Sequence, residues 1–362
     1  NGGALLPLTR APERIAVIGP NADSLDALEG NYNGTPSHPI TVLAGIRDRF
    51  PQAKVTYVEG TGLIGPANPA TGASTPDRAV AAARDADLVV FVAGLSPRIE
   101  GEEMKIKAPG FLGGDRTRID LPAPQRQLLE RVQAIGKPLV LVLMNGGALA
   151  VDWADRHVPA IIEAWYPGES GGAAVAALIA GDFSPAGRLP VTFYQSVDQL
   201  PPFADYSMSN RTYRYFKGQP LYPFGYGLSY THFTYSDARV SAARIGPDGS
   251  TTVSVTVKNS GERDGDEVIE LYLTHPGVPG APIRSLEGFQ RIHLLKGQAR
   301  SVEFTLHGRS LGIVDGAGKH RIVPGTVDIW VGGGQPVSRP GLQQAAGART
   351  QFSIAGRKLL PD

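Results

Sequence analysis

Three glutamates, Glu100, Glu102 and Glu103, lie within four positions of one segment. Carboxyl groups this close together resist joint ionisation, so the pKa of at least one of them is expected to rise. A carboxyl that keeps a proton near neutral pH can act as a general acid. The alternative interpretation is a solvated acidic turn whose charge is screened by Arg98 and Lys105.

The element that must position these glutamates is the apolar run directly before them, residues 87–93. Ligand-facing loops of parallel sheets follow the carboxyl ends of strands, which is where this segment lies. Further apolar runs occupy residues 14–19, 138–144 and 160–165. Continuous rather than alternating apolar runs indicate strands covered on both faces.

Helical patterns separate these strands, at residues 77–86, 123–135 and 171–180. Strands that alternate with helices imply parallel crossovers. The first part of the chain, residues 1–195, is therefore predicted to be an α/β sandwich with a mainly parallel sheet. This sheet is expected to carry residues 96–104, called the glutamate loop below.

The pattern changes after residue 195. Residues 196–234 are rich in aromatic residues, Pro and Gly, and are predicted to form an ordered connector. From residue 235 to 362 the strands alternate, most strictly at 251–258, followed by the turn residues Asn259-Ser260-Gly261. Short strands without helices predict an all-β, immunoglobulin-like sandwich.

Composition narrows the possible functions. The 362 residues have a net charge of +1 with no basic excess, so neither nucleic acid nor another polyanion is an expected partner. No apolar run is long enough to span a membrane. The chain has no cysteine, and its seven histidines show no metal-binding spacing, so no metal and no cofactor are predicted. Localisation stays open, with a periplasmic or secreted place favoured over the cytoplasm.

Several ordered motifs resemble glycoside hydrolase family 3, of the β-glucosidase and β-xylosidase type, over nearly the whole chain. They are Ile15-Ala16-Val17-Ile18-Gly19-Pro20-Asn21-Ala22, Gly113-Gly114-Asp115-Arg116, Ala164-Trp165-Tyr166-Pro167-Gly168, Gly187-Arg188-Leu189-Pro190 and Phe224-Gly225-Tyr226-Gly227-Leu228-Ser229-Tyr230. The resemblance implies the second domain of that family followed by its fibronectin type III-like domain.

The resemblance also implies that the two catalytic carboxyl groups come from different domains. Family members place a (β/α)₈ barrel before this region, and that barrel supplies the aspartate nucleophile; neither is expected within this sequence. The general acid/base should come from the glutamate loop. Alignment on the family's Glu-x-Glu-Gly pattern indicates Glu102, with Glu100 as runner-up and Glu103 behind it. Arg98, Glu100 and Tyr32 are expected to bind substrate, and Asp115 is expected to pair with Arg116.

The function expected from this resemblance is exo-acting hydrolysis of terminal non-reducing β-D-xylosyl or β-D-glucosyl residues by double displacement. The partners would be a β-linked oligosaccharide or glycoside and the barrel, as a domain or separate chain; a homodimer remains open. The alternative is a non-catalytic carbohydrate-binding or scaffold module. A dinucleotide-binding domain is disfavoured, because the turn Gly19-Pro20-Asn21-Ala22 lacks the Gly-x-Gly-x-x-Gly pattern.

Overall fold

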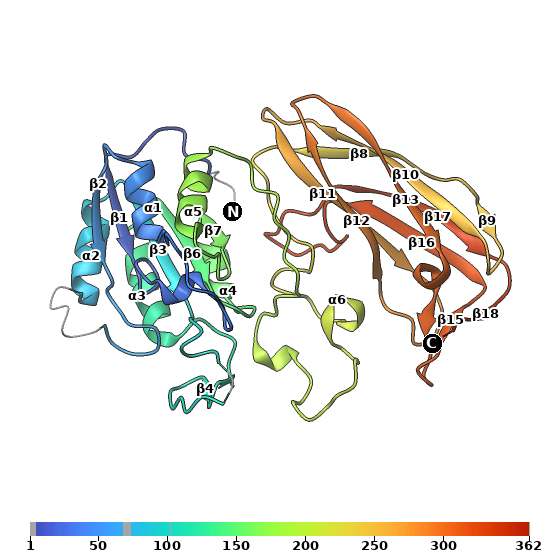
Figure 1. Ribbon diagram of the computed structural model, residues 1–362, viewed down its shortest axis with the longest axis horizontal. Coiled ribbons are helices and arrows are strands. Elements are labelled where there is room, and N and C mark those ends of the chain that lie inside the picture. The colour runs from blue at the N-terminus through green and yellow to red at the C-terminus, as the bar shows by residue number, and fades with distance from the viewer. Residues whose placement is uncertain (1–4, 68–73, 102, 362) are drawn as a thin grey trace. The chain divides into compact units, whose positions relative to one another are not determined.

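The computed structural model describes residues 5–67, 74–101 and 103–361. The chain forms two compact units (Figure 1). The first unit comprises Asn1–Phe183 and Tyr194–Gln199, and the second comprises Ser184–Phe193 and Leu200–Asp362. The domain boundaries drawn from the sequence, at residues 195 and 234, stay predictions.

The first unit is built on a five-stranded parallel sheet of order β2-β1-β3-β6-β7. The continuous apolar runs predicted four of its strands and their parallel arrangement. Its strands are β1 (Arg14–Ile18), β2 (Lys54–Val58), β3 (Leu88–Gly94), β6 (Leu139–Met144) and β7 (Ala160–Glu163). Every residue of β3 and β6 is buried. The carboxyl ends of all five strands meet at one edge, and that edge carries the glutamate loop.

Helices cover both faces of this sheet. They are α1 (Val42–Arg49), α2 (Pro76–Asp85), α3 (Ala123–Gln133), α4 (Asp152–His157) and α5 (Gly171–Ala180). Side chains of α1 and α5 share one core cluster with alternate residues of β1, β3 and β6. The intervening strand residues are equally buried. Helix α2 contacts β1 and β2, and helix α3 contacts β3. The α/β sandwich predicted from the sequence is therefore confirmed.

A small hairpin, β4 (Phe111–Leu112) and β5 (Asp115–Arg116), lies after the glutamate loop. Gly113 in its turn has a φ of 65°, a conformation that glycine adopts without steric cost. At Gly114 a Cβ atom would lie 1.7 Å from the carbonyl oxygen of Gly101. The Gly113-Gly114 pair therefore lets the hairpin turn approach the glutamate loop closely.

The second unit is an all-β sandwich, as predicted. One sheet has the order β13-β10-β8, formed by β8 (Phe233–Val240), β10 (Ser250–Asn259) and β13 (Ala299–His307). The other has the order β12-β11-β16-β17-β9, formed by β9 (Arg244–Ile245), β11 (Gly265–Thr274), β12 (Ser285–Leu294), β16 (Gly325–Gly332) and β17 (Gly347–Ile354). Alternate residues of these strands form one core, as the period of two predicts.

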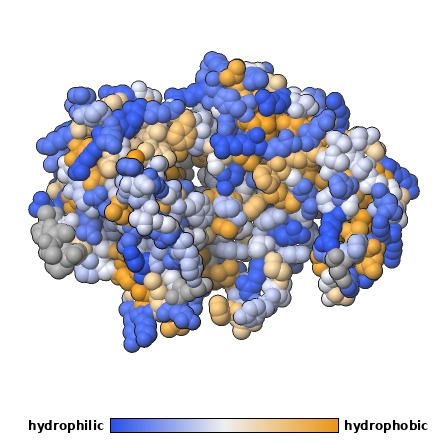
Figure 2. Space-filling model, in the orientation of Figure 1, coloured by the Kyte–Doolittle hydropathy of each residue, from blue (hydrophilic) through white to orange (hydrophobic). Residues whose placement is uncertain are grey.

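Short elements complete this unit: α6 (Thr212–Tyr215) and a minor sheet of β14 (Ile313–Val314), β15 (His320–Ile322) and β18 (Lys358–Leu359). Within the described residues, no helix is long and apolar enough to cross a membrane. On the face drawn in Figure 2, apolar residues are interspersed with hydrophilic ones.

Candidate active site

The glutamate loop begins at a strand end that only glycine fits. Gly94, the last residue of β3, has a φ of 135°, and a Cβ atom there would lie 2.0 Å from the carbonyl oxygen of Met144. The ends of β3 and β6 can therefore approach closely, and the chain leaves the sheet beside β6. Glu100 follows six residues later.

The carboxylate of Glu100 is held from three sides. The hydroxyl of Tyr166 donates a 2.6 Å hydrogen bond to Oε2, and the backbone N–H of Gly146 donates a 3.2 Å bond to the same oxygen. The guanidinium of Arg116 lies 3.9 Å from Oε1, and both side chains are about 14% exposed or less. The Nδ2 group of Asn31 also donates to the backbone oxygen of Glu100 at 3.1 Å.

These contacts come from separate elements at the carboxyl edge of the sheet. Gly146 follows β6, Tyr166 follows β7, and Arg116 belongs to the β4–β5 hairpin. Burial and the charge of Glu100 raise the pKa of Tyr166, so its hydroxyl keeps the proton that it donates. Burial lowers the pKa of Arg116 and Glu100 opposes that shift, yet an arginine stays charged.

The expected pairing of Asp115 with Arg116 is wrong. Arg116 approaches Glu100 and donates a 2.8 Å hydrogen bond from Nη2 to the backbone oxygen of Asp120. Adjacent residues of a strand point to opposite faces, so Asp115 is directed away and is exposed. Arg116 therefore anchors the glutamate loop through Glu100 rather than through its neighbour in sequence.

The other predicted site residues are placed as follows. Glu102 lies outside the described residues. Glu103 is exposed, with a φ of 51°. Arg98 pairs with Asp26 at 3.1 Å, and its side chain is 74% exposed. Tyr32 is 91% exposed. The substrate-binding roles of Arg98, Glu100 and Tyr32 stay predictions.

A second glutamate at this edge was not singled out from the sequence. Glu163 ends β7, and its Oε1 accepts a 3.2 Å hydrogen bond from the backbone N–H of Trp165. Burial raises the pKa of Glu163 to about 8, an effect that the charge of Glu100 reinforces and a hydrogen bond with the Asn145 side chain opposes. Glu163 is therefore mostly protonated at neutral pH.

Several buried polar atoms at this edge have no hydrogen-bond partner within the part of the chain that the structure describes. They are Asn21 Oδ1, Ser96 Oγ, Asn145 Oδ1 and Glu163 Oε2. Their residues follow or end β1, β3, β6 and β7. Buried polar groups normally find a protein partner or an ordered water, so this edge is suited to holding water beneath the loop.

The residues missed from the sequence are those that hold Glu100. Asn31, Gly146 and Tyr166 are far apart in the chain, and only the order of the strands brings them together. Their one sequence signal is that Gly146 and Tyr166 follow predicted strands closely. Across residues 5–67, 74–101 and 103–361, no three His, Asp or Glu side chains converge in a group that could hold a metal.

An α/β unit followed by a β-sandwich is an architecture shared with known glycoside hydrolases. A family model described as the glycosyl hydrolase family 3 C-terminal domain matches residues 1–230, and one described as a fibronectin type III-like domain matches residues 267–335. The chain belongs to glycoside hydrolase family 3.

Similar proteins include two curated enzymes. The xylan 1,4-β-xylosidase of Xylanibacter ruminicola is 31% identical, over 92% of this chain and 54% of its own length. The periplasmic β-glucosidase of Salmonella typhimurium is 37% identical, over 90% of this chain and 45% of its own length. This chain thus spans about half the length of the curated relatives that it matches.

Solved structures agree with this assignment. A β-glucosidase from Erythrobacter marinus superimposes with a TM-score of 0.81 and 32% identity, covering 98% of this chain and 48% of that chain. A family 3 exo-β-xylosidase in complex with a xylobiose aziridine probe superimposes with a TM-score of 0.83 and 28% identity, covering 99% of this chain and 47% of that chain.

Proposed function

We propose that this chain supplies the acid/base half of a retaining β-glycosidase. The enzyme would remove terminal non-reducing β-D-xylosyl or β-D-glucosyl residues from a β-linked oligosaccharide or glycoside. Relatives named as β-xylosidases and β-glucosidases support both sugars. Retaining hydrolysis needs a second carboxyl group roughly 5–5.5 Å from the first. We assign that nucleophile to an aspartate of a (β/α)₈ barrel, since none of the sheets described here is such a barrel.

The observation that carries the acid/base assignment is the confinement of Glu100. Its carboxylate already accepts hydrogen bonds from Tyr166 and Gly146 and faces Arg116. A group held in this way is suited to fixing the loop and poorly suited to exchanging protons with a substrate. Glu102, two residues further on, is then the better candidate for general acid/base, as the alignment of motifs also indicates.

The proposed reaction has two steps. In the first, the carboxylic acid of Glu102 protonates the glycosidic oxygen while the aspartate attacks the anomeric carbon and the leaving group departs. In the second, the carboxylate of Glu102 takes a proton from water, which attacks the anomeric carbon and releases the aspartate. Arg98 and Tyr32 are proposed to contact the sugar from this side.

Substitution of each glutamate in the enzyme that joins this chain to its barrel tests the assignment. Glu102→Gln should lower kcat for poor leaving groups by about 10²–10⁴-fold, because the proton donor is lost. It should spare glycosylation by an activated aryl glycoside, and azide should restore turnover. Activity on xylobiose and cellobiose, which have poor leaving groups, and on p-nitrophenyl β-xyloside and β-glucoside with and without azide provides the measurement. Intact mass identifies the chains present.

Glu103→Gln is the matched control, since it removes a neighbouring carboxyl group, and it should retain kcat within a few-fold. Glu100→Gln should reduce activity without azide rescue, because it disturbs the position of the loop rather than the proton donor. Azide rescue of Glu100→Gln, with normal activity in Glu102→Gln, would overturn the assignment. Absence of any glycosidase activity in the joined enzyme would favour the non-catalytic module instead.

A further inference from the structure

A hollow of about 240 Å³ lies in the second unit. A water molecule takes up about 30 Å³ in the liquid, so this space accommodates a small molecule rather than a single ion. Tyr213 and Phe216 form an aromatic part of its wall, and Arg284, Lys217 and Thr192 are its cationic and hydroxyl-bearing lining residues. No acidic side chain is among the residues that line it.

Arg284 is half-buried in this wall, and burial lowers its pKa. Its Nη1 donates a 2.7 Å hydrogen bond to Oε1 of Gln335, whose Nε2 in turn donates to the backbone oxygen of Phe224 at 2.7 Å. No carboxylate among the described residues pairs with Arg284. The acidic residue nearest in sequence, Glu287, interacts with Arg214, and the charged neighbour of Arg284 is another cation, Arg349.

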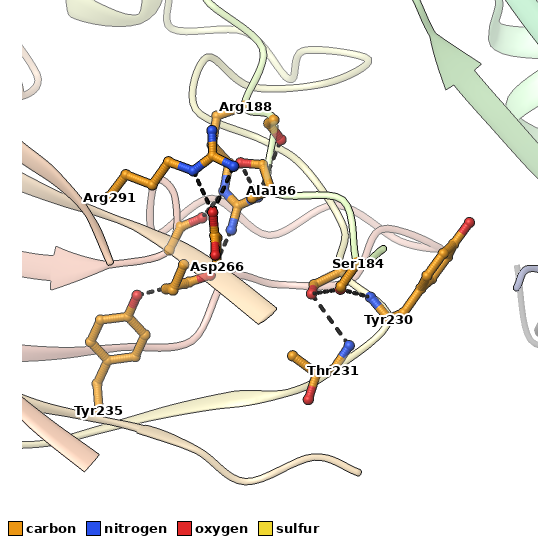
Figure 3. A network of polar contacts seen from close by, with 12 residues as sticks. Ser184, Ala186, Arg188, Tyr230, Thr231, Tyr235, Asp266 and Arg291 are labelled. Carbon is orange, nitrogen blue, oxygen red and sulfur yellow. Dashed lines mark hydrogen bonds and ion pairs between the residues drawn. The ribbon is translucent and has the colours of Figure 1, made fainter. Parts of the chain in front are cut away.

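Another arginine of the same unit shows how a buried guanidinium is usually accommodated. Arg188 donates a 2.8 Å hydrogen bond from Nη2 to Glu267, and Tyr235 donates a 2.6 Å bond to the second oxygen of that carboxylate (Figure 3). Both partners of this ion pair are less than 10% exposed. Removing a cation from water without such a partner is costly, so Arg284 is a site at which an anion would gain binding energy.

The rest of the wall is suited to a polar molecule with an apolar face. The Thr192 side chain is 8% exposed, and its Oγ1 has no hydrogen-bond partner among the described residues. The Tyr213 ring stacks on Phe224 with centroids 4.5 Å apart, and its hydroxyl accepts a hydrogen bond from the backbone N–H of Leu286 at 3.2 Å. The aromatic wall is therefore held in place before any ligand arrives.

We propose that this hollow binds a small carboxylated sugar. The carboxylate would lie on the guanidinium of Arg284, which can donate two parallel hydrogen bonds to it. The apolar ring atoms would lie against Tyr213 and Phe216. Lys217, which is exposed, adds positive charge that attracts the anion. This site is independent of the proposed acid/base function.

Calorimetric titration of the 362-residue chain with sodium glucuronate tests the proposal, with glucose as the neutral comparison. Glucuronate should bind at least tenfold more tightly than glucose, and its affinity should fall with added salt, because the charged contact contributes the difference. Arg284→Met should weaken glucuronate binding tenfold or more.

Arg244→Met, at an exposed residue of β9, is the matched control and should bind glucuronate as the wild type does. Circular dichroism establishes that each variant is folded. Should Arg284→Met fail to fold, Arg284→Lys replaces it; it keeps the charge but cannot donate two parallel hydrogen bonds, so it should also weaken glucuronate binding. Equal binding of glucose, no glucuronate binding at tens of millimolar, or full affinity in the Arg284 variant would overturn the proposal.

An Asp or Glu side chain of another domain is the alternative ligand for Arg284 in this hollow. The same titration on the enzyme that joins this chain to its barrel separates the two. A carboxylated-sugar site keeps its affinity in the joined enzyme. If glucuronate binds the 362-residue chain but not the joined enzyme, the hollow is occupied by a protein contact, and the proposal is overturned.

Discussion

A buried carboxyl group that holds a proton makes the stability of the first unit depend on pH. The pKa of Glu163 is raised to about 8, mainly by burial, whereas an ordinary glutamate in the unfolded chain titrates near pH 4.3. Between these values the folded state binds a proton that the unfolded state releases. Stability therefore falls as pH rises through this window and levels off above the folded pKa.

Glu163→Gln should remove this pH dependence, because an amide has no proton to lose. The variant should gain stability over the wild type as pH rises from 5 to 8, by at most about 1.4 kcal/mol per pH unit. Urea unfolding of the first unit at several pH values measures the difference. Glu130→Gln, on the solvent side of α3, is the control and should follow the wild type. Parallel curves for Glu163→Gln and wild type would show that Glu163 is already ionised.

At the scale of elements, the β4–β5 hairpin acts as a support for the glutamate loop. It contributes Arg116, which faces Glu100, and its turn approaches the carbonyl of Gly101. That carbonyl belongs to the residue directly before Glu102. The path of the loop at Gly101 therefore depends on Gly114, a residue that carries no reactive side chain.

Gly114→Ala should displace the loop, because its Cβ would lie 1.7 Å from the Gly101 oxygen. A misplacement of about 1 Å in a catalytic group can cost about 10²-fold in rate, so kcat of the joined enzyme on p-nitrophenyl β-xyloside should fall by about 10–100-fold. Gly65→Ala is the control, since its added Cβ meets nothing within 4 Å. Unchanged kcat in Gly114→Ala would show that the loop does not depend on the hairpin.

At the scale of the whole molecule, the two units have separate cores, one formed by strand and helix side chains and one mainly by strand side chains. We expect units with separate cores to unfold as separate cooperative transitions. Val142→Ala should lower the melting transition of the first unit, and Leu271→Ala that of the second, each by roughly 1–4 kcal/mol of stability. Scanning calorimetry of both variants measures this. A single transition that both substitutions shift equally would contradict it.

The sequence predicted the buried strands of both units, whereas one edge strand of the first sheet was missed. Strands β3 and β6 are covered on both faces, so their continuous apolar runs stood out. Edge strand β2 was missed because its side chains alternate between partly buried and exposed, with only Val58 fully buried. The contacts of Glu100 were missed because they depend on strand order, which no local pattern contains.

The contacts that hold Glu100 also bear on which neighbouring segments can change in length during evolution. Its partners, Asn31, Gly146, Tyr166 and Arg116, all lie outside residues 105–110, which connect the loop to the hairpin. Surface connections tolerate changes in length at modest entropic cost. Insertions and deletions in that connection can therefore change the surroundings of the loop while Glu100 keeps its contacts, so the length of this segment and the position of Glu100 can evolve separately.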